Sequence, residues 1–206
     1  MLLDYEVSKL DLPKLFKNSF NRSLFIAEYL HFGNDDNADF YIQYIDENID
    51  SRKIKAQEDA LELSIASGIF KPLYFEIVKK IINSKRSDWI KLLCVDWLFS
   101  FYNHLKKTDF IEINEYLLKT NTSELIKTQS ILNLLLYKNN EQLILTLLFE
   151  RIHLAKDSTV YYRLVNGLNS TYLTDKVSKK IKQDINRLIE TSSHLTDNQK
   201  NELILV

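Results

Sequence analysis

Glycine, proline and cysteine are scarce in this chain. Its 206 residues include three glycines, two prolines and one cysteine. Because hairpin turns and sheet corners depend on glycine and proline, this scarcity argues against a β-rich or Rossmann-type fold. The single cysteine, Cys94, has no partner for an internal disulfide, and its apolar neighbours Leu93 and Val95 indicate a buried thiol. We therefore expect an all-α protein in a reducing compartment.

Signatures of common enzyme classes and of membrane segments are also missing. The chain contains no Gly-x-x-x-x-Gly-Lys phosphate loop, no Gly-x-Ser-x-Gly nucleophile elbow and no His-Glu-x-x-His zinc helix. Its 27 basic and 28 acidic residues nearly cancel, whereas nucleic-acid-binding domains carry a basic excess. Apolar stretches are too short to span a bilayer, and the first residues lack the basic and long apolar regions of a secretory leader, so we expect no secretion signal. We expect a cytoplasmic, non-enzymatic protein without cofactor, metal, membrane contact or direct nucleic-acid contact.

Apolar residues recur at helical spacing along the chain. The first predicted helix starts at Asp11 and Pro13 and continues towards Gly33. Further helices are predicted from the apolar spacing and from capping residues: about 39–49, 50–67 with Gly68 as its stop, 72–82, one opened by Ser87, one opened by Thr108, one after the capping-box pattern at 121–124, and others opened by Asn139 or Asn140, Asp157, Thr174 and Thr196.

Short connections between these helices require antiparallel neighbours. The openings of alternate helices, at Pro72, Thr108, Asn140 and Thr174, recur every 32 to 36 residues, which is close to the period of a helix-pair solenoid. We predict that residues 1–206 form a single all-helical domain of antiparallel hairpins in a HEAT-like α-solenoid or superhelix. An irregular helical bundle is the alternative.

Charge is segregated along the sequence. Residues 34–62 hold nine acidic and three basic residues, whereas residues 63–107 hold three acidic and eight basic ones. Clustered carboxylates on neighbouring helices repel one another, and a cationic partner would explain them. We predict a partner-binding surface made of acidic side chains with two tyrosine anchors: Asp35, Asp36, Asp39, Tyr41, Tyr44, Asp46, Glu47, Asp50, Glu58, Asp59 and Glu62. The alternative is a solvated helix surface, paired locally by residues such as Lys55.

Two Glu-x-x-His dyads raise the possibility of a metal site. Glu28 with His31, and Glu150 with His153, would each place a carboxylate and an imidazole on one helix face. Di-iron carboxylate bundles use two such dyads together with a further Glu from each of two other helices. The first dyad lies too near the N-terminus to follow a full donor helix, so we keep this site as an alternative to protein binding.

A second enzymatic alternative comes from a tryptophan-rich segment. Trp89 and Asp96 are spaced two turns apart on one predicted helix, and Trp97 follows directly. The arrangement resembles the HEAT-like alkylpurine DNA glycosylases, and that resemblance implies that an Asp and aromatic side chains on a concave face handle the damaged nucleotide. A tryptophan in an apolar helix is ordinarily part of the core.

The chain as a whole is similar in kind to the small helical immunity proteins of bacterial contact-dependent toxin systems. The similarity lies in its size, its acidic segment 34–62 and its usage rich in Lys, Asn and Ile, without a shared residue motif. The resemblance implies a bacterial toxin inhibitor that blocks a basic toxin domain, such as a nuclease, through the acidic helical face. An adaptor or scaffold role is the alternative within the class of binding proteins.

Overall fold

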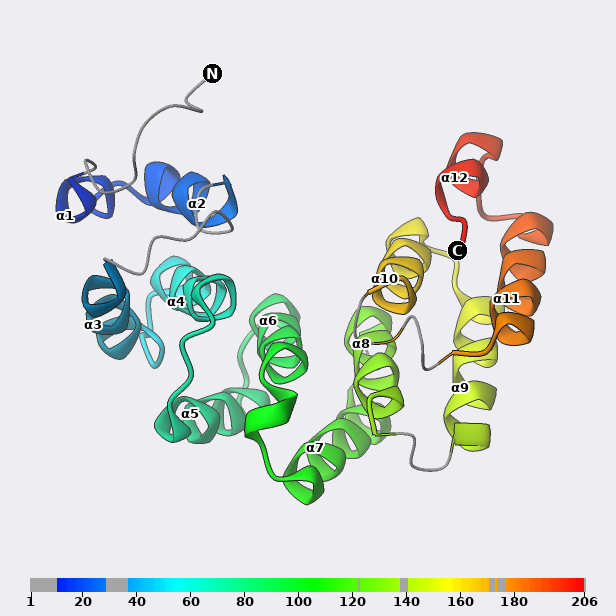
Figure 1. The fold of residues 1–206 in the computed structure, drawn as a ribbon, viewed down its shortest axis with the longest axis horizontal. Helices are drawn as coiled ribbons and strands as arrows, with labels where there is room; N and C mark the ends of the chain where they lie inside the picture. The colour runs from blue at the N-terminus through cyan, green and yellow to red at the C-terminus, as the bar shows by residue number, and fades with distance from the viewer. Residues whose placement is uncertain are drawn as a thin grey trace. The chain divides into compact units, whose positions relative to one another are not determined.

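The computed structural model describes residues 11–28, 37–121, 123–137, 141–170, 173 and 177–205; for 27–28, 141–145 and 153–154 it describes the backbone only. All regular elements in these residues are helices, as the sequence predicts. Contacts divide the chain into two compact units, Met1–His104 (unit 1) and Leu105–Val206 (unit 2) (Figure 1). None of the described helices is long and apolar enough to cross a membrane.

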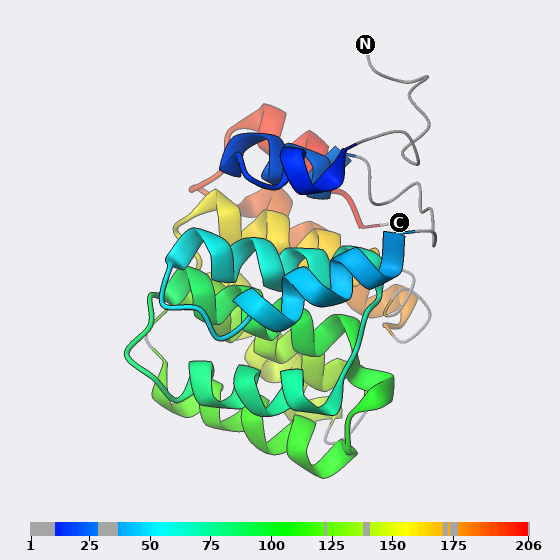
Figure 2. The same cartoon turned by 90° about the vertical axis from the view of Figure 1, so that its left-hand side faces the viewer.

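The helices of unit 1 form two layers (Figures 1 and 2). Helix α4 packs against α2, α3 and α6, and α5 packs against α6. The layer of α2, α4 and α6 therefore faces a layer that contains α3 and α5. The elements are α1 (Leu12–Leu15), α2 (Ser19–Glu28), α3 (Ala38–Asn48), α4 (Ile54–Ser67), α5 (Pro72–Ile82), α6 (Asp88–Ser100) and the 3-10 turn η4 (Tyr102–His104).

The first predicted helix is interrupted, and the prediction of one continuous helix is wrong. Asp11 caps α1 as expected, but α1 ends at Leu15 and α2 begins at Ser19. The break lies at Asn18, whose side-chain oxygen accepts hydrogen bonds from the backbone N–H groups of Phe20 and Asn21 at 2.9 and 3.1 Å. This side-chain cap competes with continuation of the helix through the same segment.

The other helix ends in unit 1 follow the sequence signals closely. The helices predicted for 39–49 and 72–82 are α3 and α5. Gly68 ends α4 with a φ of 68°, a left-handed conformation that favours glycine. Ser87 caps α6 by accepting a hydrogen bond from the N–H of Ile90. Helix α4 starts at Ile54, four residues later than predicted.

Helix α6 supplies much of the core of unit 1. Seven of its 13 residues are buried, including Cys94 and Trp97. The indole N–H of Trp97 donates a 2.8 Å hydrogen bond to the hydroxyl of Ser64 on α4, and its ring stacks on Phe70. This bond satisfies the one polar group of the indole, so the whole side chain is buried without an unpaired donor.

Unit 2 is organised around α8, which packs against α7, α9 and α10, and α11 packs on α9. Helix α8 is buried on nearly all sides, and two of its buried polar residues, Gln129 and Asn133, join a chain of hydrogen bonds. Arg163 donates to Gln129, Gln129 donates to Asn133, and Asn133 donates to Asn114 on α7. The elements are α7 (Lys107–Thr120), α8 (Glu124–Leu135), α9 (Glu141–Leu154), α10 (Ser158–Leu168), α11 (Lys179–Thr191) and α12 (Asp197–Glu202).

The capping predictions in unit 2 have mixed outcomes. Asp157 and Thr196 open α10 and α12 as predicted, and Thr196 in addition forms a complete capping box with Gln199. Thr108 does not cap α7, because that helix already begins at Lys107. Ser123 stands at the N-cap of α8 without a side-chain capping bond. Thr174 lies outside the described residues, and α11 is capped by Ser178.

Candidate functional site

Two carboxylates, Asp46 in α3 and Asp50 directly after it, form exposed ion pairs with Lys71 at the N-cap of α5 and with Lys80 in α5. Asp46 accepts hydrogen bonds from the Lys71 ammonium at 2.6 Å and from the Tyr74 hydroxyl at 2.7 Å. These two donors lower the pKa of Asp46 below its ordinary value. The Asp50 carboxylate, directly after α3, lies 2.7 Å from the Lys80 ammonium. The negative segment 34–62 is therefore partly neutralised by the positive segment 63–107 within unit 1.

Asp59 lies in the interior of unit 1, so its predicted place on an outer face is wrong. Its side chain has no exposed area, and the guanidinium of Arg22 on α2 lies 2.5 Å from its carboxylate. The Ser23 hydroxyl donates a 2.9 Å bond to it, and the Lys55 ammonium lies 3.2 Å away. Three donors thus replace the water that the carboxylate loses on burial, which makes Asp59 a structural residue joining α2 to α4.

The two tyrosines predicted as central anchors are not free for a partner. Tyr41 is 5% exposed. Tyr44 is half-buried, packs edge-on against Phe16 at 5.0 Å and carries the Arg22 guanidinium over its ring. Burial raises the pKa of Tyr44 to about 12. Both side chains belong to the packing between the N-terminal helices and α3, and the prediction of exposed anchors is wrong for Tyr41.

The remaining predicted acidic residues differ in their surroundings. Asp39 and Glu47 are exposed on α3 and form no ion pair with any described residue; Glu47 accepts a 3.0 Å bond from Gln43. Glu58 is paired with Lys55 at 3.4 Å. Burial raises the pKa of Glu62. Asp35 and Asp36 lie outside the described residues.

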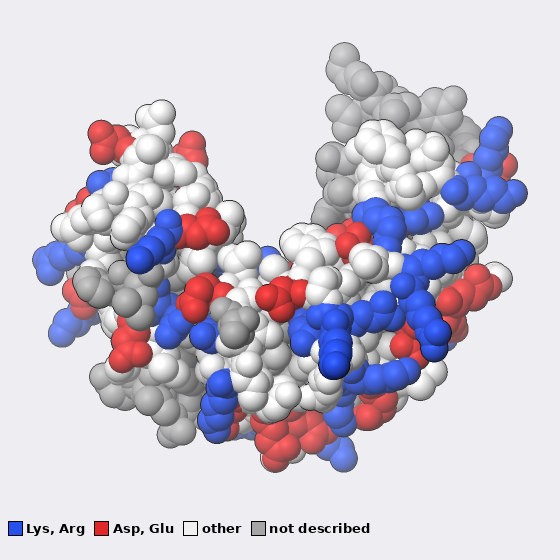
Figure 3. Space-filling model, turned by 180° about the vertical axis from the view of Figure 1, so that it is seen from behind, with Lys and Arg blue, Asp and Glu red and all other residues white. Residues whose placement is uncertain are grey.

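A group of basic side chains occupies one edge of unit 1, which the sequence reasoning did not single out. The loops 49–53 and 83–87 lie on the same side of the unit (Figure 2), and the Arg86 guanidinium donates to the carbonyls of Ser51 and Arg52 at 3.0 and 3.4 Å. We call this surface the basic edge and define it by five residues: Arg52, Lys53, Lys80, Lys85 and Arg86. Figure 3 shows the unit from this side, with Lys and Arg side chains gathered over it.

Two large apolar side chains are exposed beside the basic edge. Trp89 in the first turn of α6 is 52% exposed, and Ile54 at the start of α4 is 55% exposed. Trp97, by contrast, is fully buried two turns along the same helix. Asp96, which lies between these two tryptophans in the sequence of α6, is half-buried. The two tryptophans therefore face different environments, and they do not line one surface as the glycosylase comparison implies.

The described residues do not form the group of ligands that the metal-site alternative requires. Glu150 on α9 is exposed. The side chains of Glu28 and His153, and the whole of His31, lie outside the described part of the chain. Within that part, no three His, Cys, Asp or Glu side chains gather closely enough to hold a metal ion. The Cys94 thiol is fully buried, and burial raises its pKa, which keeps it protonated.

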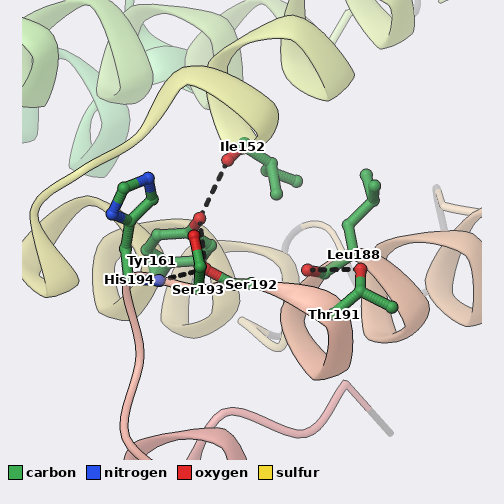
Figure 4. Close-up of a pocket in the computed structure, with 7 residues that line it drawn as sticks. All are labelled: Ile152, Tyr161, Leu188, Thr191, Ser192, Ser193 and His194. Carbon is green, nitrogen blue, oxygen red and sulfur yellow. Dashed lines mark hydrogen bonds between the residues drawn. The ribbon is translucent and has the colours of Figure 1, made fainter.

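Unit 2 contains a pocket of about 330 Å³ at the contact of α9, α10 and α11 (Figure 4). Its polar wall is built by the Tyr161 hydroxyl, which donates to the Ile152 carbonyl at 3.1 Å and lies 3.0 Å from the Ser192 hydroxyl. His194 is exposed at the rim, and its backbone N–H donates to Ser192. Its imidazole is not hydrogen-bonded to either serine in the pocket, so the nucleophile–base pair of a hydrolase is not formed there.

Comparison of the chain with protein-family models, with curated proteins and with solved structures found no match.

Proposed function

We propose that this chain is a non-catalytic, protein-binding inhibitor of the immunity type, which acts in the cytoplasm on a basic protein toxin. The observation that carries the proposal is the set of exposed carboxylates on and directly after α3: Asp39, Asp46, Glu47 and Asp50. Four carboxylates within one exposed stretch raise the local negative potential, which would steer a cationic protein surface towards α3.

The ion pairs of α3 with α5 leave this surface open to a partner. Asp46 and Asp50 face Lys71 and Lys80 in exposed pairs, and such pairs contribute only about 0–1 kcal/mol to stability. An arginine or lysine of a partner can replace either lysine at little energetic loss. Asp39 and Glu47 form no ion pair with a residue that the structure describes, and they would add directly to the attraction.

The arrangement within unit 1 supports the helix-hairpin form of the proposed fold. Helices α2, α4 and α6 lie in one layer and α3 and α5 in the other, so successive helices alternate between layers. We propose that this alternation is a HEAT-like stack of hairpins. In such a stack the outer layer presents whole helix faces, as α3 does, to a protein partner.

Affinity capture with charge-reversed variants tests the proposed function. The tagged chain is incubated with lysate of its source organism, and captured proteins are identified by mass spectrometry at low and high salt. A basic protein should be retained by the wild type at low salt and lost from the variant Asp39→Lys/Glu47→Lys. The control Glu112→Lys/Glu115→Lys makes the same change of charge at exposed positions of α7 and should retain it. Equal retention by both variants would remove α3 from the interface.

A further inference from the structure

The basic edge of unit 1 has a surplus of positive charge that intramolecular contacts do not use. The two stretches 50–55 and 79–91 contain eight Lys and Arg residues and two carboxylates, Asp50 and Asp88. Three of the eight are paired with carboxylates: Lys80 with Asp50, Lys79 with Glu76, and Lys55 with Glu58 and Asp59. Arg52, Lys53 and Lys85 are exposed and form no ion pair with any described residue. The near-zero net charge of the whole chain therefore conceals a local cationic surface, because the balancing acidic residues lie elsewhere in the chain, three of them on α3 and one at the buried Asp59.

The course of α4 and α6 places the N-terminal ends of both helices at this edge. Ser64 meets Trp97 through a 2.8 Å hydrogen bond, and the Ser51 carbonyl meets Arg86 near the two helix starts. The two partners are 33 residues apart in the first contact and 35 residues apart in the second. The chain therefore advances in the same direction along both helices, and α4 and α6 run parallel. The positive ends of two helix dipoles thus reinforce the cationic side chains, and the edge favours anions.

Trp89 adds a flat aromatic surface to the same edge. It stands in the first turn of α6, three residues after Arg86, and half of its side chain is exposed. Trp97, the other tryptophan of the chain, is fully buried. Exposure is therefore a property of Trp89 and not of both tryptophans in this fold. Proteins bind single-stranded nucleic acids with this combination of an exposed aromatic ring and nearby lysine and arginine side chains. The bases stack on the ring, and the phosphates contact the cations.

We propose that the basic edge together with Trp89 binds single-stranded nucleic acid. Arg52, Lys53 and Lys85 contact phosphates, and the Trp89 indole stacks on an unpaired base. A base pair within a duplex does not present its face to a side chain, and an acidic polypeptide offers carboxylates without a ring to stack. This inference is independent of the proposed function, because it uses different side chains and a partner of opposite charge.

A binding titration with a 12-nucleotide oligothymidylate tests the proposal on the full chain. Fluorescence anisotropy of the labelled oligonucleotide measures affinity, and intrinsic tryptophan emission reports on the indole. We expect saturable binding at about 20 mM salt, and a loss of about 100-fold or more in affinity at 200 mM salt if three or more phosphates are neutralised. Tryptophan quenching should accompany binding and disappear in Trp89→Phe, because the buried Trp97 does not reach the ligand.

Variants separate the two contributions. Trp89→Ala should lower the affinity about fivefold or more through loss of one stacked base. Arg52→Glu/Lys53→Glu should lower it about tenfold or more. The matched control Lys179→Glu/Lys180→Glu reverses two adjacent exposed lysines at the start of α11 in unit 2 and should leave affinity unchanged. Circular dichroism verifies that all variants keep the helical content and melting temperature of the wild type.

Three results would overturn the proposal. The first is an absence of oligonucleotide binding by the wild type at low salt. The second is an equal loss of affinity in the α11 control, which would assign binding to overall charge. The third is equal competition by polyglutamate or by a 12-base-pair duplex, which would assign the surface to an acidic protein or to non-stacking phosphate contacts.

Discussion

The Lys71 ammonium lies 2.6 Å from the carboxylate of Asp46, although 25 residues separate them in sequence. With the hydroxyl of Tyr74 as a second donor, this contact ties α3 to α5 in one layer of unit 1. The opposite charges of segments 34–62 and 63–107 are thereby brought together within the molecule.

Stability should respond to acid through Asp46. The pKa of this carboxyl is lowered in the folded state, so the unfolded chain takes up a proton at a higher pH than the folded chain. The contribution of the contact is present above the ordinary pKa of an aspartate and is lost as the pH falls through the lowered value. We expect the melting temperature of Asp46→Asn to fall less between about pH 6 and pH 3 than that of the wild type.

Lys71→Met provides the matching control for this pH experiment. If the lysine is the main cause of the lowered pKa, its removal should weaken the acid response in the same way, and the double variant should resemble either single one. Additive effects of the two substitutions would contradict the direct contact.

The buried pair of Arg22 and Asp59 should be a sensitive point of unit 1. Removal of one partner leaves a charge without compensation in the interior, so we expect Arg22→Met to lower the free energy of unfolding by about 3–5 kcal/mol. Lys55→Ala removes only the exposed contact of Asp59 and should lower it by less than about 1 kcal/mol. Urea unfolding measures both values, and similar losses in the two variants would contradict the buried role of Arg22.

The bond between Ser64 and Trp97 should stabilise the contact of α4 with α6. Ser64→Ala leaves the indole N–H buried without an acceptor, which should lower the free energy of unfolding by about 1–3 kcal/mol. Ser67→Ala is the control, because the Ser67 hydroxyl bonds only to a carbonyl of its own helix. Equal stability of both variants in urea would show that the indole has another partner.

Gly167 should be required for the close approach of α10 to α8. A Cβ atom at this position would lie 2.5 Å from a methyl carbon of the buried Leu132. We expect Gly167→Ala to lower the free energy of unfolding by about 1–3 kcal/mol through overpacking. In Leu132→Ala the added methyl group has space, so the loss caused by Gly167→Ala should shrink in that background. An undiminished loss there would contradict the steric explanation.

The fold class and many helix ends are accessible from the sequence because they depend on local chemistry. Ser87, Asp157 and Thr196 cap helices through contacts within three residues, and Gly68 ends α4 through its own backbone. The break at Asn18 is equally local, and its signal was the capping side chain in front of Ser19. The helical spacing of apolar residues continues across the break, so this spacing predicted one continuous helix.

The surroundings of the charged residues could be predicted less well from the sequence, because they depend on partners far along the chain. Asp59 is buried because of Arg22, 37 residues earlier, and helical spacing alone does not identify that partner. The pairing of α3 with α5 did leave a signal, since a negative segment is followed by a positive one of similar size. Because α3 and α5 lie in the same layer of unit 1, that order becomes contacts between Asp46 and Lys71 and between Asp50 and Lys80.

Inhibition of a basic protein toxin is tested most directly by a growth experiment with the captured partner. The partner is expressed alone and together with the chain in the same host. We predict that the partner alone arrests growth, and that the wild type and Glu112→Lys/Glu115→Lys restore growth while Asp39→Lys/Glu47→Lys does not. A partner that is harmless when expressed alone would contradict the inhibitor function and favour an adaptor or scaffold.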